Sequence, residues 1–173
     1  MAMEGAVYIK GVQTYKGMNP VTTRKDSSVV LEFQMGVSGP RDSATGLSLG
    51  KRLWQPIMWR QPVDAAVVQY QQALTQNEVL TSVKFDFFRP QSNQLASGAK
   101  GSVGGEKTAF YTIELTNAQF QSVRFIQQYT RSEHPEIKNS EIMAEVLVTF
   151  MKITQTWADG GISMSDDWTS PQG

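Results

Sequence analysis

The sequence predicts a mainly β protein, a compact antiparallel β-barrel or sandwich with one flanking α-helix and a long extended loop. Many short segments combine strand-forming residues with alternating polarity, one segment alone has helical spacing, and turn-forming residues recur between them. That combination is typical of small barrels and sandwiches. A length of 173 residues, with 40% hydrophobic and 18% charged residues, fits a single globular domain over residues 1–173.

The first half of the chain begins with an expected short strand at residues 6–12. Residues 28–35 carry the clearest period of two, broken only by Val30, and predict a half-buried antiparallel strand. Its apolar face would hold Val29, Leu31, Phe33 and Met35, and its polar face Ser28, Glu32 and Gln34. The extended loop is expected at about residues 37–53, and a further strand at residues 53–59.

One helix is predicted, over about residues 65–76, with Asp64 as its N-cap. Its apolar positions recur at helical spacing: Ala66, Tyr70, Ala73 and Leu74. The opposite side is polar: Gln69, Gln72 and Gln76.

The second half of the chain is expected to add four more strands. They are predicted at residues 82–88, 108–115, 119–128 and 144–156, with a turn at residues 116–118 between the second and third. Residues 91–107 are rich in Gly, Ser, Gln and Ala, which predicts a flexible hairpin tip. Asp159, Gly160 and Gly161 would close the last strand, and residues 162–173 would form a tail.

The stretch GLSLGKR at residues 46–52 resembles a phosphate-binding loop but lacks its chemistry. That motif needs four residues between its glycines and a hydroxyl side chain after its lysine. Three residues separate Gly46 from Gly50 here, and Arg52 follows Lys51. Pro56 also disfavours the helix that should follow. We interpret the stretch as part of an ordered loop rather than a nucleotide site.

Neither a catalytic centre nor a metal or cofactor site is indicated by the sequence. The single histidine, His134, lies in a polar loop with no nucleophile motif nearby, where a solvated side chain is the commoner case. The chain has no cysteine, which excludes disulfides and thiolate ligands. Asp159, Asp166 and Asp167 do not have the spacing of a calcium-binding loop. We therefore expect no enzyme and no cofactor.

The charge balance and hydropathy narrow the possible partners. Sixteen basic residues balance sixteen acidic residues, whereas nucleic-acid-binding proteins usually carry a basic surplus. No apolar stretch has the length of a signal-peptide core or a bilayer-spanning helix. We expect no nucleic acid partner, no direct membrane insertion, and export, if it occurs, by a route other than a signal peptide.

Four segments, in this order, resemble the haemolysin-coregulated (Hcp) tube-protein family of bacterial type VI secretion systems. The first is PRDSATG followed by GKR and a proline (residues 40–56), and the second runs from Asn77 to FDFFRP at residues 85–90. The third is FYTIELTNA at residues 110–118, and the fourth is WADGG followed by DDW at residues 157–168. Four ordered matches are more specific than any single one.

The resemblance implies a β-barrel protomer that forms six-membered rings, which stack into a tube inside a contractile sheath. The chain would be its own main partner, would meet sheath, spike and baseplate proteins, and would carry small effector proteins in the ring lumen. Assembly would take place in the bacterial cytoplasm, followed by secretion to the extracellular space or a target cell. A tail-tube protein of a phage or other contractile particle, or a monomeric barrel that binds a small ligand or peptide, stays open as an alternative.

Under this interpretation two sets of residues matter. The expected contacts to a neighbouring subunit or ring lie in the extended loop: Pro40, Arg41, Asp42, Ser43, Thr45, Gly46, Gly50, Lys51 and Arg52. The residues shared with the family motifs are expected to be structural: Asn77, Arg89, Pro90, Thr116, Asn117, Trp157, Asp159, Gly160, Gly161, Asp166, Asp167 and Trp168.

Overall fold

A computed structural model describes residues 4–89, 109–127 and 141–168, and it confirms a mainly β fold with one α-helix. The strands of the first half are β1 (Glu4–Lys10), β2 (Ser28–Val30), β3 (Glu32–Gln34), β4 (Val37–Ser38), β5 (Leu53–Trp54) and β6 (Ile57–Pro62). A short 3-10 helix spans Thr22–Arg24, and α1 spans Ala65–Thr75. The second half contributes β7 (Leu80–Phe88), β8 (Ala109–Ile126), β9 (Met143–Trp157) and β10 (Ile162–Asp167).

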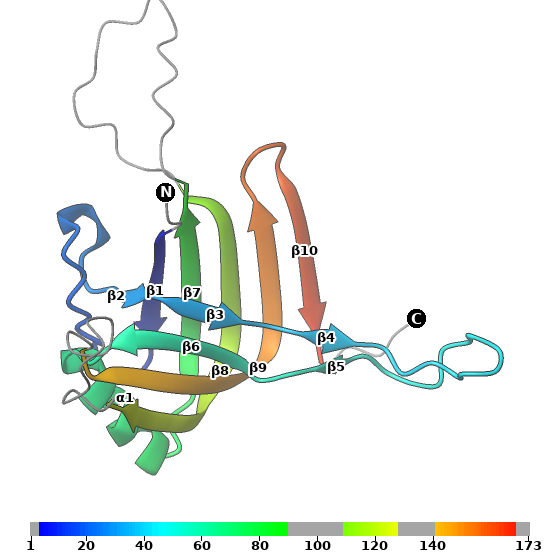
Figure 1. The fold of residues 1–173 in the computed structure, drawn as a ribbon, viewed down its shortest axis with the longest axis horizontal. Coiled ribbons are helices and arrows are strands. Elements are labelled where there is room, and N and C mark those ends of the chain that lie inside the picture. Colours follow the sequence, from blue (N-terminus) through cyan, green and yellow to red (C-terminus); the bar gives the residue numbers. More distant parts are fainter. Residues whose placement is uncertain (1–3, 90–108, 128–140, 169–173) are drawn as a thin grey trace, which may run out of the picture.

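The main sheet is antiparallel and curls until its two ends meet. Its strand order is β2-β1-β7-β8-β9-β6-β3, with β10 paired to β9. Strands β2 and β3 are consecutive in the chain but lie at opposite ends of this order, so the chain joins the two ends of the sheet at Leu31. The Leu31 N–H donates to the Arg60 carbonyl at 2.9 Å. Figure 1 shows one wall of upright strands and a second wall in which β3, β6 and the bent ends of β8 and β9 cross it. The result is a nearly closed barrel.

This crossing corrects the predicted strand at residues 28–35. Leu31, expected inside, is 59% exposed, whereas Val30, expected to be the exception, is 7% exposed and belongs to the core. The chain pairs with β1 up to Val30 and with β6 from Glu32, so the two short strands do not share one alternation. The predicted strand at 53–59 is likewise divided, into β5 and β6 on either side of Gln55 and Pro56.

Strand β8 corrects the predicted turn at residues 116–118, because the strand continues through it to Ile126. Asn117 takes a left-handed conformation, with φ of 50°, in the row where β7, β8 and β9 all change which alternate side chains are buried. Ile113 and Leu115 are fully buried before it, and Ala118 and Phe120 are buried after it, so the parity of the alternation shifts by one. Without this shift Ala118 would point to the opposite face.

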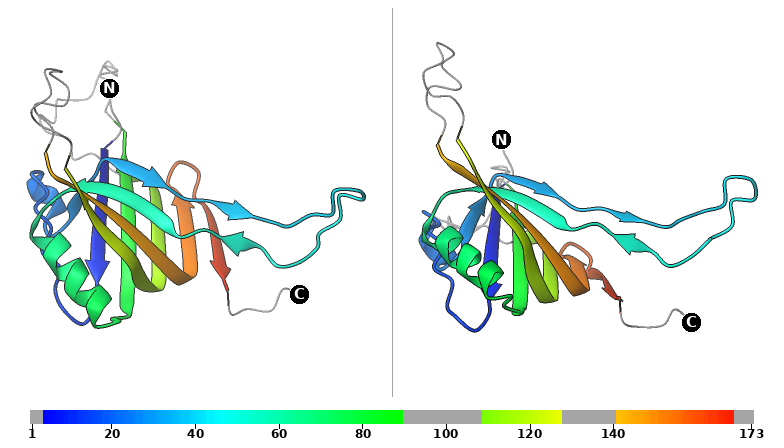
Figure 2. Two further views of the ribbon diagram at one scale, coloured as in Figure 1. Left: turned by 60° about the horizontal axis from the view of Figure 1, so that its bottom comes forward. Right: turned by 90° about the horizontal axis from the view of Figure 1, so that it is seen from below.

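Helix α1 covers one end of the barrel, close to its predicted bounds (Figure 2). The Asp64 carboxylate caps it by accepting from the Val67 N–H at 3.3 Å, and it also accepts from the Ser28 hydroxyl at 2.6 Å. The buried face of the helix includes Tyr70, whose ring lies 6.2 Å from Trp59. Truncation of one such fully buried aromatic side chain typically costs about 3–5 kcal/mol of stability.

The predicted tail from residue 162 begins as a strand, because β10 pairs with β9 from Ile162 opposite Trp157 to Asp167 opposite Lys152. The intervening turn needs its two glycines, since Gly160 and Gly161 have φ of 99° and 65°. Sequence predictions for residues 91–107 and for His134 lie outside the described residues.

Candidate functional site

The predicted extended loop forms a two-stranded ribbon, which we call the hairpin arm (residues 37–54). At its base β4 pairs with β5, with Val37 opposite Trp54 and Ser38 opposite Leu53. Further out, Arg41 and Ser48 form an isolated β-bridge, and the Leu49 N–H donates to the Pro40 carbonyl at 2.9 Å. Figures 1 and 2 show the arm projecting from the barrel at the end away from α1. The loop is therefore ordered backbone that extends beyond the core.

The tip of the hairpin arm is shaped by Asp42. Its carboxylate accepts from the Thr45 hydroxyl at 2.6 Å and from the Ala44 N–H at 3.1 Å, while its carbonyl accepts from the Gly46 N–H at 2.8 Å. The Thr45 hydroxyl and then the Ala44 N–H hold the pKa of Asp42 below its usual value. Gly46 has φ of 70°, a conformation that favours glycine. The D-x-x-T-G spacing thus encodes a self-contained turn.

The base of the hairpin arm is fixed to β10 by a clamp of three side chains. The Arg52 guanidinium donates through Nε and Nη2 to both carboxylate oxygens of Asp166, and its Nη2 also donates to the Asp167 carbonyl at 3.0 Å. The Trp54 indole N–H donates to Asp166 Oδ2 at 2.7 Å, and its ring packs against Phe150. Arg52 first, and Trp54 with it, hold the pKa of Asp166 below its usual value.

Arg41 and Lys51, two residues of the predicted contact set, are exposed on the hairpin arm. Arg41 donates to the Gly46 carbonyl at 3.2 Å, and neither Arg41 nor Lys51 forms an ion pair among the described residues. Ser43 and Gly50 are exposed on the same ribbon. The prediction missed the two most exposed apolar side chains of the arm, Leu47 and Leu49, which are 69% and 67% exposed. Their i, i+2 spacing in an extended segment was the available signal.

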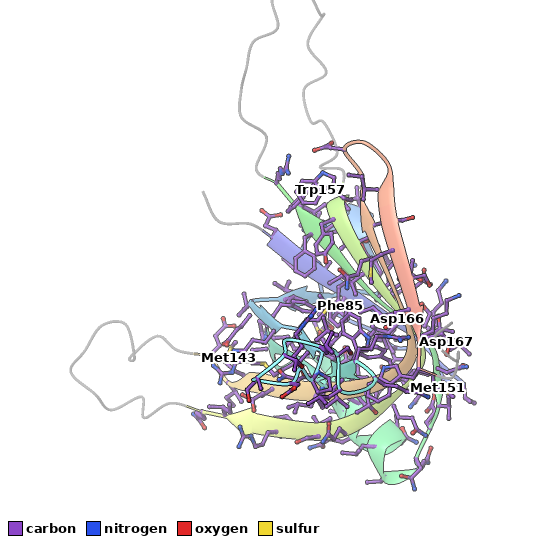
Figure 3. All side chains as sticks on the ribbon, turned by 90° about the vertical axis from the view of Figure 1, so that its right-hand side faces the viewer. Phe85, Met143, Met151, Trp157, Asp166 and Asp167 are labelled. Atoms are coloured by element: carbon purple, nitrogen blue, oxygen red, sulfur yellow. The ribbon has the colours of Figure 1, made fainter. Side chains whose placement is uncertain are left out.

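Three residues of the second predicted set, Arg89, Trp157 and Asp159, lie together in one cluster. Arg89 pairs with Asp159 at 3.0 Å, and its guanidinium lies 4.4 Å from the Phe110 ring centre and 5.0 Å from that of Trp157. This cluster sits at the turn between β9 and β10, far along these strands from Asp166, as Figure 3 shows. Pro90 lies outside the described residues.

Asn77 and Trp168 have local structural positions. Asn77 ends α1 with φ of 52°, where its N–H donates to the Leu74 carbonyl and the Glu78 N–H donates to the Ala73 carbonyl, a Schellman motif. Trp168 lies beside the clamp and lines a recess of about 170 Å³ together with Lys51, Arg52 and Leu53. Thr116 precedes the left-handed Asn117 in β8.

Comparison with known proteins decides the family. Residues 3–157 match the family model described as "Type VI secretion system effector, Hcp". The chain belongs to the Hcp family.

Relatives of this Hcp chain cover most of its length. The "Major exported protein" of Pseudomonas aeruginosa is 29% identical over 147 residues, which span 85% of this chain and 78% of that protein. Among solved structures, a crystal structure of an Hcp protein has a TM-score of 0.82 at 20% identity, covering 98% of this chain and 100% of that one. The Hcp1 protein from E. coli EAEC 042 has a TM-score of 0.77 at 22% identity, covering 96% and 99%. Both structures share the fold.

Membership in the Hcp family identifies a type VI secretion tube protein, and the family is a structural one rather than an enzyme family. Within the described ranges, no group of three or more His, Cys, Asp or Glu side chains could hold a metal ion. None of the helices described is long and apolar enough to cross a membrane.

The sequence did not predict a row of alternating charges on this Hcp chain. Glu32, Arg60, Glu145 and Arg124 lie opposite one another on four adjacent strands, β3, β6, β9 and β8. Arg60 bonds Glu32 and Glu145, both at 2.8 Å, and Arg124 bonds Glu145. The two arginines, Arg60 before Arg124, hold the pKa of the 6%-exposed Glu145 below its usual value. Only the strand register brings these residues together, so no sequence spacing could show it.

Proposed function

We propose that this Hcp chain forms six-membered rings that stack into the inner tube of a type VI secretion system, with the hairpin arm contacting a neighbouring copy. The observation that supports this role is the arm itself, an ordered ribbon held at its base by the Arg52–Asp166 clamp. It carries two exposed leucines and two cations that form no ion pair with the residues the structure describes. Exposed apolar side chains on a projecting ordered segment favour a protein contact. The neighbouring copy is the natural partner in a self-assembling family.

The proposal extends to export and cargo. A ring closes through a head-to-tail interface between unlike surfaces, and stacking adds a second interface of this kind that does not close. The name of the Pseudomonas aeruginosa relative, "Major exported protein", supports secretion of this chain as well. We place sheath, spike and baseplate proteins outside the tube and small effector proteins within its lumen, in line with the family resemblance.

Alanine at Asp42 tests the role of the arm. Because Asp42 shapes only the exposed tip, Asp42→Ala and its neighbour Arg41→Ala should leave protomer folding intact and lower the fraction of rings or tubes. Native mass spectrometry and negative-stain imaging measure assembly, and circular dichroism measures folding. Asp159→Ala, another carboxylate on an exposed turn, is the matched control.

Two results would contradict the proposal. The wild-type chain could remain monomeric at every concentration, which is the behaviour of a monomeric binding module. Alternatively, Asp42→Ala could unfold the protomer while the surviving fraction assembles normally, which would make the tip a folding element.

A further inference from the structure

A thioether meets an amide donor at the root of the hairpin arm. Met35 lies between β3 and β4, where the chain leaves the barrel and crosses β9 (Figure 1). The Gln155 Nε2 of β9 donates to the Met35 sulfur at 3.9 Å, and the partly buried Met35 side chain packs against the core. The next residue, Gly36, accepts at its carbonyl from the Gln55 N–H at 2.9 Å, so both chains of the arm leave the barrel together here. Met35 therefore ties the arm root to β9.

The amide of Gln155 is held in this orientation by a second hydrogen bond. Its Oε1 accepts from the Tyr111 hydroxyl at 2.8 Å, and the Tyr111 ring stacks on Phe87 at 5.9 Å. The amide nitrogen consequently faces the sulfur. A thioether is a weak acceptor, so Met35 satisfies this donor only weakly. Within the described ranges, the sulfur atoms of the other methionines accept no hydrogen bond: Met18, Met58, Met143, Met151 and Met164.

We infer that Met35 is a site of oxidation by peroxide-class oxidants, and that its sulfoxide oxygen accepts the hydrogen bond from Gln155. In this reaction the sulfur lone pair attacks one peroxide oxygen and the O–O bond breaks. The proton on the transferred oxygen passes to the departing hydroxide, which leaves as water, so sulfur is oxidised by two electrons and peroxide is reduced. The separation of 3.9 Å between nitrogen and sulfur exceeds the about 2.7–3.2 Å of an N–H···O bond, and an oxygen bonded to sulfur fits in this interval.

The consequence is an arm root that tolerates oxidation. A sulfoxide oxygen without a donor in this largely apolar contact would destabilise the fold. With Gln155 in place, the amide exchanges a weak acceptor for a strong one, and the root keeps its contact with β9. The chain has no cysteine, so thioethers are its only oxidisable sulfur. Oxidising conditions are usual outside the cytosol. This behaviour belongs to the single chain and does not depend on assembly.

Complete oxidation with hydrogen peroxide, followed by thermal melts of the full chain, tests the site. Met35→Leu and Gln155→Glu are made alone and together, and are compared with the protein that carries neither. Gln155→Glu keeps an oxygen that accepts from Tyr111 but replaces the amide donor with a carboxylate oxygen at pH 8. Met164→Leu is present in all four proteins, because Met164 lies opposite Gln155 on β10.

Two measurements isolate the effect of the Met35 sulfoxide. Peptide mass spectrometry gives the oxidised fraction at each methionine. The Tm shift of the Met35→Leu proteins gives the part due to the other methionines, and this part is subtracted. All four proteins are compared in the same oligomeric state, since assembly alone raises apparent stability.

With Gln155 present, the sulfoxide at Met35 should lower Tm by less than about 2 °C. With Gln155→Glu it should lower Tm by about 3–8 °C, the loss expected for one unsatisfied buried polar group in a chain of this length. Gln155→Leu removes the donor without adding a charge and should also enlarge the loss, so it serves if Gln155→Glu does not fold.

Two results would overturn the inference. Equal Tm shifts with and without the Gln155 amide, after complete oxidation of Met35 in both, would show that the amide does not receive the sulfoxide. A Met35 sulfur that stays unoxidised while the 70%-exposed Met18 is fully converted would exclude the site itself.

Discussion

Replacing Asp166 with asparagine measures what the clamp at the base of the hairpin arm contributes. The carboxylate takes two bonds from Arg52 and one from Trp54, and the Arg52 and Asp166 side chains are 23% and 12% exposed. Exposed ion pairs contribute roughly 0–1 kcal/mol, whereas breaking a fully buried pair costs about 3–5 kcal/mol. This pair lies between those limits, so Asp166→Asn should lose about 2 kcal/mol at pH 7. For a chain of this length that corresponds to a fall in Tm of about 4–8 °C.

Urea unfolding followed by tryptophan fluorescence gives the free energy, at a concentration where both proteins have the same oligomeric state, because assembly alone raises apparent stability. The pKa of Asp166 is lowered in the folded state, so its contribution is present above the pKa of an unfolded aspartate and is lost as the pH falls through the folded pKa. The difference between wild type and Asp166→Asn should therefore be constant from pH 6 to pH 8 and should shrink toward pH 3.

Asp159→Asn is the matched control, because Asp159 is in the same β9–β10 hairpin and pairs with Arg89 in solvent, with side chains 67% and 50% exposed. It should cost less than about 1 kcal/mol. Equal losses for the two variants at pH 7, or a difference that grows on acidification, would refute the reasoning about the clamp.

Two further substitutions test the fold around the site. Glu145→Gln should lower the free energy of unfolding by about 1 kcal/mol at neutral pH, because it leaves two arginines without their shared carboxylate. This loss should disappear as the pH falls through the lowered pKa of Glu145. Urea unfolding at pH 7 and pH 3 measures it, and a loss independent of pH would argue against the charged row. Asn77→Val should lower the free energy of unfolding by about 1–2 kcal/mol, because a β-branched residue is strained at φ of 52°. Asn77→Gly should leave it nearly unchanged. Thermal melts in which the two variants are equally stable would contradict the Schellman motif.

Local signals were sufficient for some elements. Asp64 before a run of helically spaced apolar residues predicted α1 to within one residue at its end, because a cap and an amphipathic face are both read from neighbouring positions. The strands β7 and β9 were found in the same way, from alternation bounded by turn residues.

The sequence predictions of two strands were wrong where the alternation of buried and exposed side chains changes within the segment. The alternation of buried side chains in β8 changes at Asn117, so an uninterrupted strand looked like two strands and a turn. At Leu31 a change of strand partner reversed the expected face. In each case the pairing with distant strands, rather than local preference, decides the conformation.

The sequence predicted residues 37–53 as a long ordered loop, but not the contacts that this segment makes. Residues 40–52 were singled out, yet the clamp joins Arg52 to Asp166, 114 positions away, and no pattern within either segment shows that they meet. The predicted contact set did not include Leu47 and Leu49, which the structure leaves exposed, and it included Asp42, whose carboxylate accepts hydrogen bonds within the tip.

The self-contained tip of the hairpin arm affects the entropy of any association it takes part in. Ordering a flexible segment costs about 1–2 kcal/mol for each backbone residue that becomes fixed. Here the Asp42 turn and the clamp fix the arm when the protomer folds, before it meets another copy. A preorganised arm loses little conformational freedom on docking, so two leucines and two cations can support a contact that a disordered loop with the same side chains would make only weakly.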